Sequence, residues 1–414
     1  MHCRMTTFSL VGTAAALVSA SVSSQATGFD LPDQDAFAIA RGMAFVATAD
    51  NPSAVYYNPA GITQLQGHNV RGGVYGLHLQ SSYESPAGGS FDNEKEWHAI
   101  PQLFYTYGPK QLPVALGLGV FSPFGLSSKW PQDSGFRTVA TEGSLATLTF
   151  NPVVAWQIVP TLSVAAGLTV NHAEIDLRQG LTPVPSNDEF RFHGDDWDVG
   201  FNLGLRWQPH PKVSLGASYR SATTMNYRGY TDTRVDAPVP PVFPSAFSLH
   251  QDADAKFPLP QKVIGGVSYR PTPAWNFEVN VDWTDWNRLN SVDVHQASSP
   301  SQTLVLDWRS SLYYEFGATR YFGSGWSVSA GYIFNENSVP DAHYSPLVGD
   351  LDRHFFSAGV GYRGRHFTCD VAYQFGYGPT HSVQGSEPSA WGESADGHYE
   401  FRSHAVCLTL GCRL

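Results

Sequence analysis

A period-two alternation of apolar and polar residues recurs along most of this chain and constrains its fold more than any other feature. From Phe201 to Trp207 every second residue is apolar, and the residues between them are Asn, Gly and Arg. Segments 213–220, 326–334 and 367–376 alternate in the same way. Successive side chains of a strand point to opposite faces, so each strand has one apolar and one polar face. Repeated many times, with aromatic residues near strand ends, this pattern is typical of a lipid-facing barrel with a polar lumen.

Fourteen segments of this kind can be placed, and the connections between them are alternately long and short. The segments begin near Val70, Glu96, Pro113, Ala146, Thr161, Asp195, Lys212, Ala253, Ala274, Thr303, Ser324, Gly349, Arg365 and His398. The long connections are 82–95, 122–145, 177–194, 229–252, 289–302, 335–348 and 376–397. Outer-membrane barrels have long external loops and short periplasmic turns. The sequence therefore predicts an all-β fold: a fourteen-stranded antiparallel transmembrane β-barrel over residues 70–414, in a cell outer membrane of the Gram-negative type.

The first 26 residues are organised like an export signal. Arg4 supplies a positive charge, residues 8–20 are apolar or small, and Ser24-Gln25-Ala26 places small residues at a cleavage position. The apolar stretch is too short to span a bilayer. A buried N-terminal helix is the alternative, but the stretch has no amphipathic face. We therefore predict a signal peptide over residues 1–26 and a mature chain that begins at Thr27.

Composition limits the partners and the chemistry of the chain. Charged residues make up only 15%, against roughly 25% in a typical soluble domain. The net charge is −11, so we expect no basic face that would attract the phosphates of a nucleic acid. Cys369, Cys407 and Cys412 remain after cleavage and lack metal-ligand spacing, and whether two of them form a disulfide stays open. We expect no cofactor and no bound metal.

Residues 27–69 do not show the alternation of the barrel strands. The Ala-rich stretch 33–49 has apolar residues at roughly helical spacing, and Asn51-Pro52 and then Asn58-Pro59-Ala60-Gly61 interrupt it. The segment is apolar, yet it is too short to form a hydrophobic core of its own. We therefore predict that residues 27–69 form a small helical hatch that plugs the barrel. A periplasmic N-terminal arm is the alternative.

Six short motifs give the chain a resemblance to a known family. They are Thr27-Gly28-Phe29, Ala54–Gly61, Ser122–Leu126, Thr149–Ala155, Leu259-Pro260 with Trp283–Trp286, and Val339–Asp341 with Asp350–Arg353. Each motif is short, but the six occur in the family's order along the whole mature chain. In this respect the chain resembles the FadL-type long-chain fatty acid and hydrocarbon transporters of bacterial outer membranes (OMPP1/FadL/TodX). The resemblance implies a fourteen-stranded barrel plugged by an N-terminal hatch.

The resemblance also implies passive uptake of hydrophobic molecules, above all long-chain fatty acids. Such a ligand is caught at external loops, passes to an inner pocket near the mature N-terminus, and leaves sideways beside a kinked third strand. The matching residues are Gly28 and Phe29 at the pocket, Asn58, Pro59 and Ala60 in the hatch, and Pro123, Phe124 and Gly125 at the lateral gap. Alternatively, Asn58-Pro59 forms an ordinary turn, and Phe29 only packs within the hatch.

Pro123 carries a prediction that does not need the resemblance. Proline has no amide hydrogen to donate to a sheet, so the third strand should end or kink there and leave carbonyls of a neighbouring strand unpaired. A lumen arginine would suit the carboxylate of a fatty acid. The sequence does not choose among Arg206, Arg220, Arg309 and Arg320.

Several other functions can be compared with this one. Aromatic or aliphatic hydrocarbons would use the same route. A lipid hydrolase is disfavoured, because no GxSxG motif occurs and His343-Tyr344-Ser345 falls in a predicted external loop. The apolar hatch argues against a general aqueous porin. We therefore expect a non-enzymatic monomer whose partners are hydrophobic small molecules, outer-membrane lipids, lipopolysaccharide and the outer-membrane insertion machinery.

Overall fold

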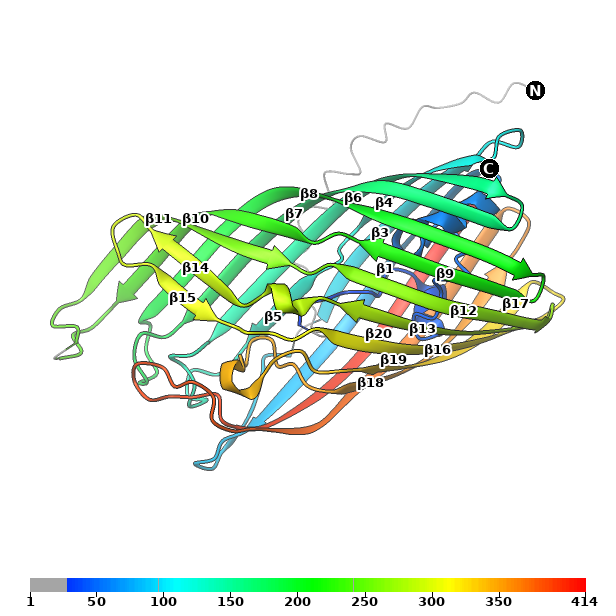
Figure 1. Ribbon diagram of the computed structural model, residues 1–414. Helices are drawn as coiled ribbons and strands as arrows, with labels where there is room; N and C mark the ends of the chain where they lie inside the picture. Colours follow the sequence, from blue (N-terminus) through cyan, green and yellow to red (C-terminus); the bar gives the residue numbers. More distant parts are fainter. Residues whose placement is uncertain (1–27, 96, 241) are drawn as a thin grey trace, which may run out of the picture.

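The chain forms a single closed barrel of antiparallel strands with a small N-terminal segment inside it (Figure 1). The computed structural model describes residues 28–414 apart from 96 and 241, so the predicted signal peptide lies outside the described residues. The first and last strands close the barrel by pairing with each other, from Asn69 opposite Arg413 to Glu84 opposite His398. Closure leaves no free sheet edge at this seam, as a lipid environment requires.

Fourteen strands form the barrel wall, as predicted. Eight are continuous: β1 (Gly67–Glu84), β6 (Glu142–Val159), β7 (Leu162–Gln179), β8 (Glu189–His210), β17 (Trp326–Asn335), β18 (Arg353–Arg363), β19 (Phe367–Val383) and β20 (Gly397–Arg413). Six consist of two pieces: β2 (Ser90–Asp92) with β3 (Trp97–Gly108), β4 (Val114–Phe121) with β5 (Gly125–Lys129), β9 (Val213–Arg220) with β10 (Thr223–Val235), β11 (Phe247–Leu259) with β12 (Lys262–Thr272), β13 (Trp275–Thr284) with β14 (Ser291–Gln296), and β15 (Gln302–Val305) with β16 (Ser311–Tyr321). The barrel begins at Gly67, three residues before the boundary placed at residue 70.

The alternation in the sequence corresponds to the two faces of the wall. On β8, the side chains of Phe201, Leu203 and Leu205 are 41–44% exposed, whereas Asn202 is 1% exposed. Apolar side chains therefore face outward, where lipid covers them, and polar side chains face the lumen. Among residues 28–414, no helix is long and apolar enough to cross a membrane.

On one side of the barrel, four neighbouring wall strands are interrupted at a similar height. The interruptions are 221–222, 260–261, 285–290 and 306–310; the third contains the 3-10 helix η3 (Trp286–Arg288). Beyond them the outer pieces β10, β11, β14 and β15 extend away from the rest of the wall (Figure 1). At the interruptions, large side chains turn inward and are buried: Leu259, Trp286, Leu289 and Trp308. These inward side chains line the lumen on the side of the long loops.

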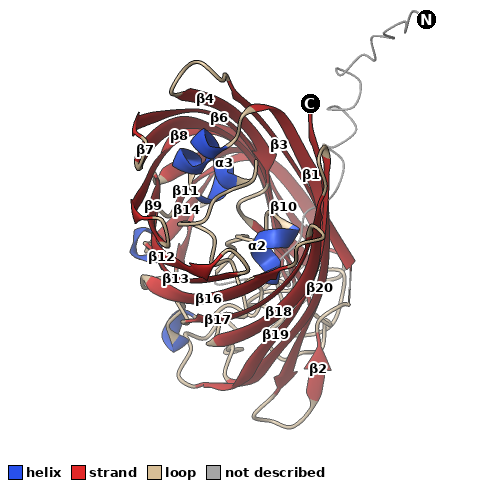
Figure 2. Cartoon of the chain, turned by 90° about the vertical axis from the view of Figure 1, so that its right-hand side faces the viewer, coloured by secondary structure: helices blue, strands red, loops and turns tan. Residues whose placement is uncertain are grey.

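The N-terminal segment lies inside the ring of strands (Figure 2). It contains two short helices, α2 (Ala36–Ala40) and α3 (Ala54–Tyr57), and the 3-10 helix η2 (Pro59–Gln64). The prediction of helical structure over 33–49 was therefore too long. Gly42 and Met43 have φ angles of +59° and +58°, which no helix can contain. A Cβ on Gly42 would lie 2.7 Å from the backbone nitrogen of Tyr332, so close packing against the wall turns the chain there.

Buried ion pairs attach this hatch to the wall. Glu278 of β13 accepts hydrogen bonds from the backbone N–H groups of Ala47 (2.8 Å) and Thr48 (3.1 Å), and it pairs with Arg41 at 3.5 Å. Arg71 of β1 pairs with Asp35 of the hatch, and also with Asp370 of β19, the next strand but one in the wall. Buried charges are stable only when they are paired, so these contacts fix where the hatch lies.

Replacing Glu278 by Ala should release the hatch and leave the barrel intact. The change removes the carboxylate partner of Arg41 and the acceptor of two backbone N–H groups, which costs about 3–5 kcal/mol. The wall ladder does not use this side chain. We expect normal heat-modifiable migration on gels, but rapid proteolysis within residues 28–66. Glu174→Ala, which removes an exposed carboxylate of β7, is the control. Equal protease resistance of the two variants would contradict the anchoring role.

Candidate functional site

The third wall strand is broken between β4 and β5, and the start of the hatch pairs with the break. The Leu31 N–H donates to the carbonyl of Pro123 (2.8 Å), and the Gly125 N–H donates to the carbonyl of Phe29 (2.8 Å). Asp30 and Phe124 form an antiparallel bridge between these bonds. Residues 29–31 therefore act as a short inner strand against the break.

Other groups satisfy the remaining backbone of the break. The Ser122 carbonyl accepts a hydrogen bond from the Gln34 side chain (2.7 Å). The hydroxyl of Thr147, on β6, accepts from the Phe124 N–H (3.1 Å) and donates to the Phe124 carbonyl (2.5 Å). The carbonyls of the break itself are thus paired, although proline cannot donate to a ladder.

The unpaired backbone lies on the neighbouring strand. β3 pairs with β4 only from Leu103 to Tyr107, and residues 97–102 of β3 pair with β1 alone. β5 pairs only with β6. Beyond this stretch, the Glu94 N–H donates to the Lys129 carbonyl (2.8 Å). Within the described part of the chain, the wall ladder is therefore interrupted between β3 and β5, and it is closed above and below the interruption.

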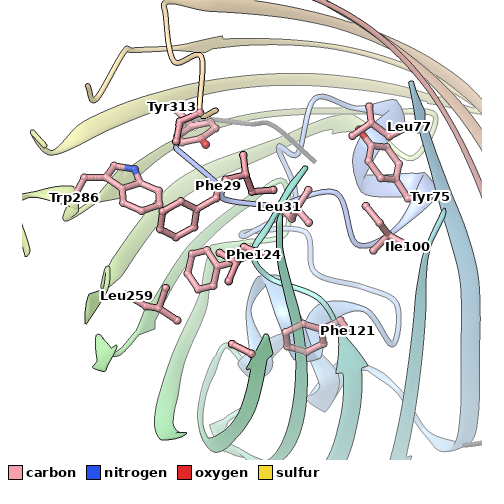
Figure 3. Packing of buried hydrophobic residues seen from close by; sticks show 14 of the residues in the cluster. Phe29, Leu31, Tyr75, Leu77, Ile100, Phe121, Phe124, Leu259, Trp286 and Tyr313 are labelled. Atoms are coloured by element: carbon pink, nitrogen blue, oxygen red, sulfur yellow. The ribbon is translucent and has the colours of Figure 1, made fainter. Parts of the chain in front are cut away.

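Phe29 lies at the centre of an aromatic cluster beside this interruption (Figure 3). Its ring centroid is 4.8 Å from that of Trp286, 5.6 Å from that of Trp308 and 5.9 Å from that of Phe124. Gly28 has a φ of +61°, and a Cβ there would lie 2.7 Å from the Trp308 ring. Only glycine fits between these rings in this conformation.

A cavity of about 380 Å³ adjoins Phe29 on the side of the external loops. Most of its lining is aliphatic or aromatic: Leu126, Leu145, Ile175, Phe190, Phe192, Phe257, Leu289, Val294, Leu306, Trp308, Leu347 and Val348. Three external loops contribute the rest of its rim, through Val139, Tyr344 and Pro388. Phe29 touches this cavity and also contacts Phe124 at the break, so it stands between the two.

An ion pair holds the N-terminal strand in place. The Lys262 ammonium lies 2.6 Å from a carboxylate oxygen of Asp30 and 2.9 Å from one of Asp282. All three side chains are buried. Because Asp30 lies between Phe29 and Leu31, this pair fixes the segment that covers the break.

A second buried polar group lies beside the cavity, at the base of the loop between β17 and β18. The Arg353 guanidinium stacks on Phe401 at 4.1 Å, donates to the Gly349 carbonyl (2.7 Å) and lies 3.9 Å from Asp350. Its Nε and Nη1 have no hydrogen-bond partner among the described residues, and neither has the hydroxyl of Tyr344. Burial raises the pKa of Tyr344, and the nearby guanidinium opposes that shift. Burial also raises the pKa of Asp350, again against the effect of Arg353.

Sequence reasoning did not give Arg353 a role. It identified Asp350–Arg353 as a motif, but considered four other arginines as partners of a carboxylate. Arg206 bonds to the Ala47 carbonyl, and Arg220 stacks on Tyr56. Arg320 stacks on Trp275, and Arg309 is exposed. The cavity lining contains neither these four arginines nor Arg353; it contains Arg178, which pairs with Asp176 at 3.0 Å. The unpaired N–H groups of Arg353 appear only once the fold is known.

The Asn58-Pro59-Ala60 motif lies away from the cavity, and its hydrogen bonds hold the hatch together. The Asn58 side chain donates to the carbonyls of Val46 (2.7 Å) and Leu205 (2.9 Å). Its oxygen accepts the Ala60 N–H (3.2 Å), and Pro59 begins η2. Asn58 thus caps η2 and ties the hatch to β8, which is the ordinary role of asparagine at such a position.

The whole described barrel and its hatch agree with a known family model. The model for outer membrane protein transport proteins (OMPP1/FadL/TodX) matches residues 17–414. This chain belongs to that family. As a FadL-family member it is an outer-membrane, non-enzymatic channel for the uptake of hydrophobic compounds.

Several known proteins are similar to this chain at low sequence identity. The 47 kDa outer membrane protein of Pasteurella multocida is 24% identical over 404 residues, covering 90% of each chain. A long-chain fatty acid transport protein of Shigella flexneri is 22% identical over 446 residues, covering 96% of each. Among solved structures, a Pseudomonas aeruginosa FadL homologue has a TM-score of 0.81 at 17% identity, covering 93% of this chain and 99% of that one. The Ralstonia pickettii toluene transporter TbuX has a TM-score of 0.72 at 16% identity, covering 92% and 98%.

Replacing Gly28 by Ala should weaken ligand binding without affecting assembly. A Cβ at a left-handed φ costs about 1–2 kcal/mol, and the Trp286 and Trp308 rings leave no room for it. We expect residues 28–31 to be displaced and the dissociation constant of pyrene, measured by fluorescence in detergent, to rise about tenfold. Gly88→Ala is the matched control, since Gly88 also has a positive φ but has no atom near its Cβ position. Unchanged affinity in Gly28→Ala would place the binding pocket elsewhere.

Replacing Pro123 and Gly125 together by Val should close the interruption in the wall. Valine favours extended strand, and residue 123 gains an N–H that can pair with the free edge of β3. We expect pyrene binding to persist while uptake by cells that lack their own FadL-type channel is lost. Pro113→Val, at the start of β4, controls for the loss of a proline. Full uptake by the folded double variant would show that ligands leave by another route.

Proposed function

We propose that this FadL-family chain takes up long-chain fatty acids, through the cavity at Phe29 and the interruption between β3 and β5. One observation carries the proposal: Tyr344 lines an apolar cavity and lies near the buried guanidinium of Arg353, which has unpaired N–H groups. A fatty acid has the matching chemistry, with an apolar chain and an anionic head.

The two ends of such a ligand would be stabilised in different ways. Each methylene buried in the cavity contributes about 0.8 kcal/mol. Arginine is always charged, and its N–H groups form strong hydrogen bonds with carboxylates. Asp350 lies 3.9 Å from Arg353 and also accepts the Ser338 N–H and hydroxyl, so it neutralises the guanidinium only in part. A carboxylate at Nε or Nη1 would complete its hydrogen bonding.

The route from the cavity to the membrane passes the N-terminal strand. Phe29 separates the cavity from Phe124, and residues 29–31 cover the break by backbone pairing. Displacing this short strand would connect the cavity with the interruption between β3 and β5. An acyl chain could then leave sideways into lipid, without crossing an aqueous lumen that would solvate it poorly. The hatch supports this route over that of a general porin, because it occupies the lumen.

Uptake of neutral hydrocarbons is the second candidate. The rings of Phe29, Trp286 and Trp308 would suit an aromatic ligand, and one solved relative, TbuX, is a toluene transporter. A fatty acid has a carboxylate and a hydrocarbon has none. Binding of a fatty acid should therefore depend on Arg353, and binding of a hydrocarbon should not.

Replacing Arg353 by Met should separate the two candidates. It removes the N–H donors, so the affinity for oleate should fall by about 1.5–3 kcal/mol, roughly 10- to 150-fold, while that for hexadecane or toluene stays unchanged. Binding to purified protein is measured by calorimetry, and uptake by cells that carry each variant. Arg353→Lys tests for a role in folding, and Arg309→Met is the control for an exposed arginine. Equal oleate binding by wild type and Arg353→Met would remove the support for a fatty acid.

A further inference from the structure

A second interruption of the wall lies on the outer surface, between β8 and β10. Their backbones pair from Arg228, opposite Asp195, to Arg234. β8 pairs with β9 only from Asn202 onward. Between these stretches, carboxylates replace carbonyls: Asp198 accepts the Thr224 N–H, and Asp196 accepts the Asn226 N–H, both at 2.6 Å. Two aspartate side chains therefore stand between the strands and hold them apart.

A crevice of about 760 Å³ lies at this place, over β8, β10, β11 and β14. The residues that matter for its chemistry are Trp197, Arg228, Asp252, Asp254, Lys256 and His295. All six side chains are exposed on the outside of the wall. The crevice is separate from the lumen cavity, which Phe257 and Val294 line from the inner side of the same strands.

The crevice lies just beyond the apolar band that faces lipid. On the part of β11 that lines the crevice the exposed residues are charged: Asp252, Asp254 and Lys256. On β12, past the interruption at 260–261, they are apolar, such as Val263 and Val267. On β8 the exposed Trp197 is followed by Val199 and Phe201. Long loops mark this end of the barrel as external. The crevice therefore lies at the height of the headgroups of the outer leaflet.

The two cations of the crevice, Arg228 and Lys256, have no side-chain partner among residues 28–414 as far as these are described. No ion pair or side-chain hydrogen bond of Arg228 or Lys256 is found in the described parts of the chain, although Arg228 is opposite Asp254 in the register. Farther out on β10, Arg234 pairs with Asp236 at 2.9 Å. On β8 itself, Arg191 pairs with Asp176 of β7. Arg228 and Lys256 are thus free for an external anion.

We propose that this crevice binds the phosphorylated sugar headgroup of lipopolysaccharide. Arg228 and Lys256 would bind its phosphate, because both side chains are strong donors to anionic oxygen. The carboxylates of Asp252 and Asp254 would accept hydrogen bonds from sugar hydroxyls. Trp197 lies where aromatic residues mark the membrane interface, and the acyl chains would lie along Val199 and Phe201 below it. This site does not take part in the transport route.

The test measures lipopolysaccharide retained by the purified barrel. Wild type, Arg228→Ala/Lys256→Ala and Arg288→Ala/Arg309→Ala are extracted from the same type of outer membrane, and bound glycolipid is counted by native mass spectrometry. The control variant, Arg288→Ala/Arg309→Ala, loses the same charge from exposed positions that do not line the crevice. An interfacial cation contributes about fivefold to binding of an anionic lipid, so the first double variant should retain about 30-fold less glycolipid than wild type. The control variant should retain the wild-type amount.

Two results would overturn the proposal. One is equal glycolipid retention by wild type and Arg228→Ala/Lys256→Ala, provided that both migrate heat-modifiably. The other is tight binding of inorganic phosphate alone, which would identify a site for a free anion instead of a headgroup. Fatty-acid uptake by Arg228→Ala/Lys256→Ala is measured in parallel and should equal that of wild type, so that failure of this proposal and failure of the transport proposal can be told apart.

Discussion

Every backbone N–H and C=O group that faces lipid needs a partner, and the rest of this structure depends on that requirement. The long pairing of β1 with β20 meets it at the seam, where the ends of the barrel wall come together. Elsewhere the ladder stops, and other groups take its place except along residues 97–102 of β3, whose second edge has no ladder partner among the described strands. The groups that replace the ladder hydrogen bonds differ from one interruption to the next.

The two interruptions have different substitutes and different surroundings. At the third strand, the backbone of the hatch and the side chains of Gln34 and Thr147 take over the hydrogen bonds, and the neighbouring rings are apolar. Between β8 and β10, the carboxylates of Asp196 and Asp198 take over, and the surroundings are charged. At the third strand, the backbone of residues 29–31 and the Gln34 side chain belong to the hatch, which can move without breaking a covalent link in the wall, and only Thr147 belongs to a wall strand. The substitutes on β8 belong to the wall itself. The interruption at the third strand therefore suits a passage for ligands, whereas the interruption between β8 and β10 suits a fixed binding site on the surface.

Much of the fold could be predicted from the sequence, because two-residue alternation and loop length are local properties. The predicted strand starts lie within six residues of the observed ones, as with Asp195 for Glu189 and Ala253 for Phe247. The helix over 33–49 was predicted too long, since the wall backbone against Gly42, and not the apolar spacing, ends it. Of the six wall strands that are divided into pieces, only the third was predicted to break, at Pro123. The division elsewhere depends on inward side chains such as Trp286 and Trp308, whose neighbours come from distant parts of the chain. Arg353 was missed for a related reason: its lack of partners is a property of three-dimensional packing.

The hatch anchors also determine the order in which the protein can assemble. Asp35 pairs with Arg71, which in turn holds Asp370, and the Ala36 N–H donates to the hydroxyl of Thr409 (3.0 Å). The segment that leaves the ribosome first therefore finds its last partner on the final strand. Contacts over such sequence separations are slow to form, because the chain entropy is lost before the contacts are made. The seam requires β20, and so does the hydrogen bond between Ala36 and Thr409. A chain that stalls before its last strand therefore lacks the closed seam and this hatch contact at once, whereas the hatch contacts with β8, β12 and β13 do not depend on that strand.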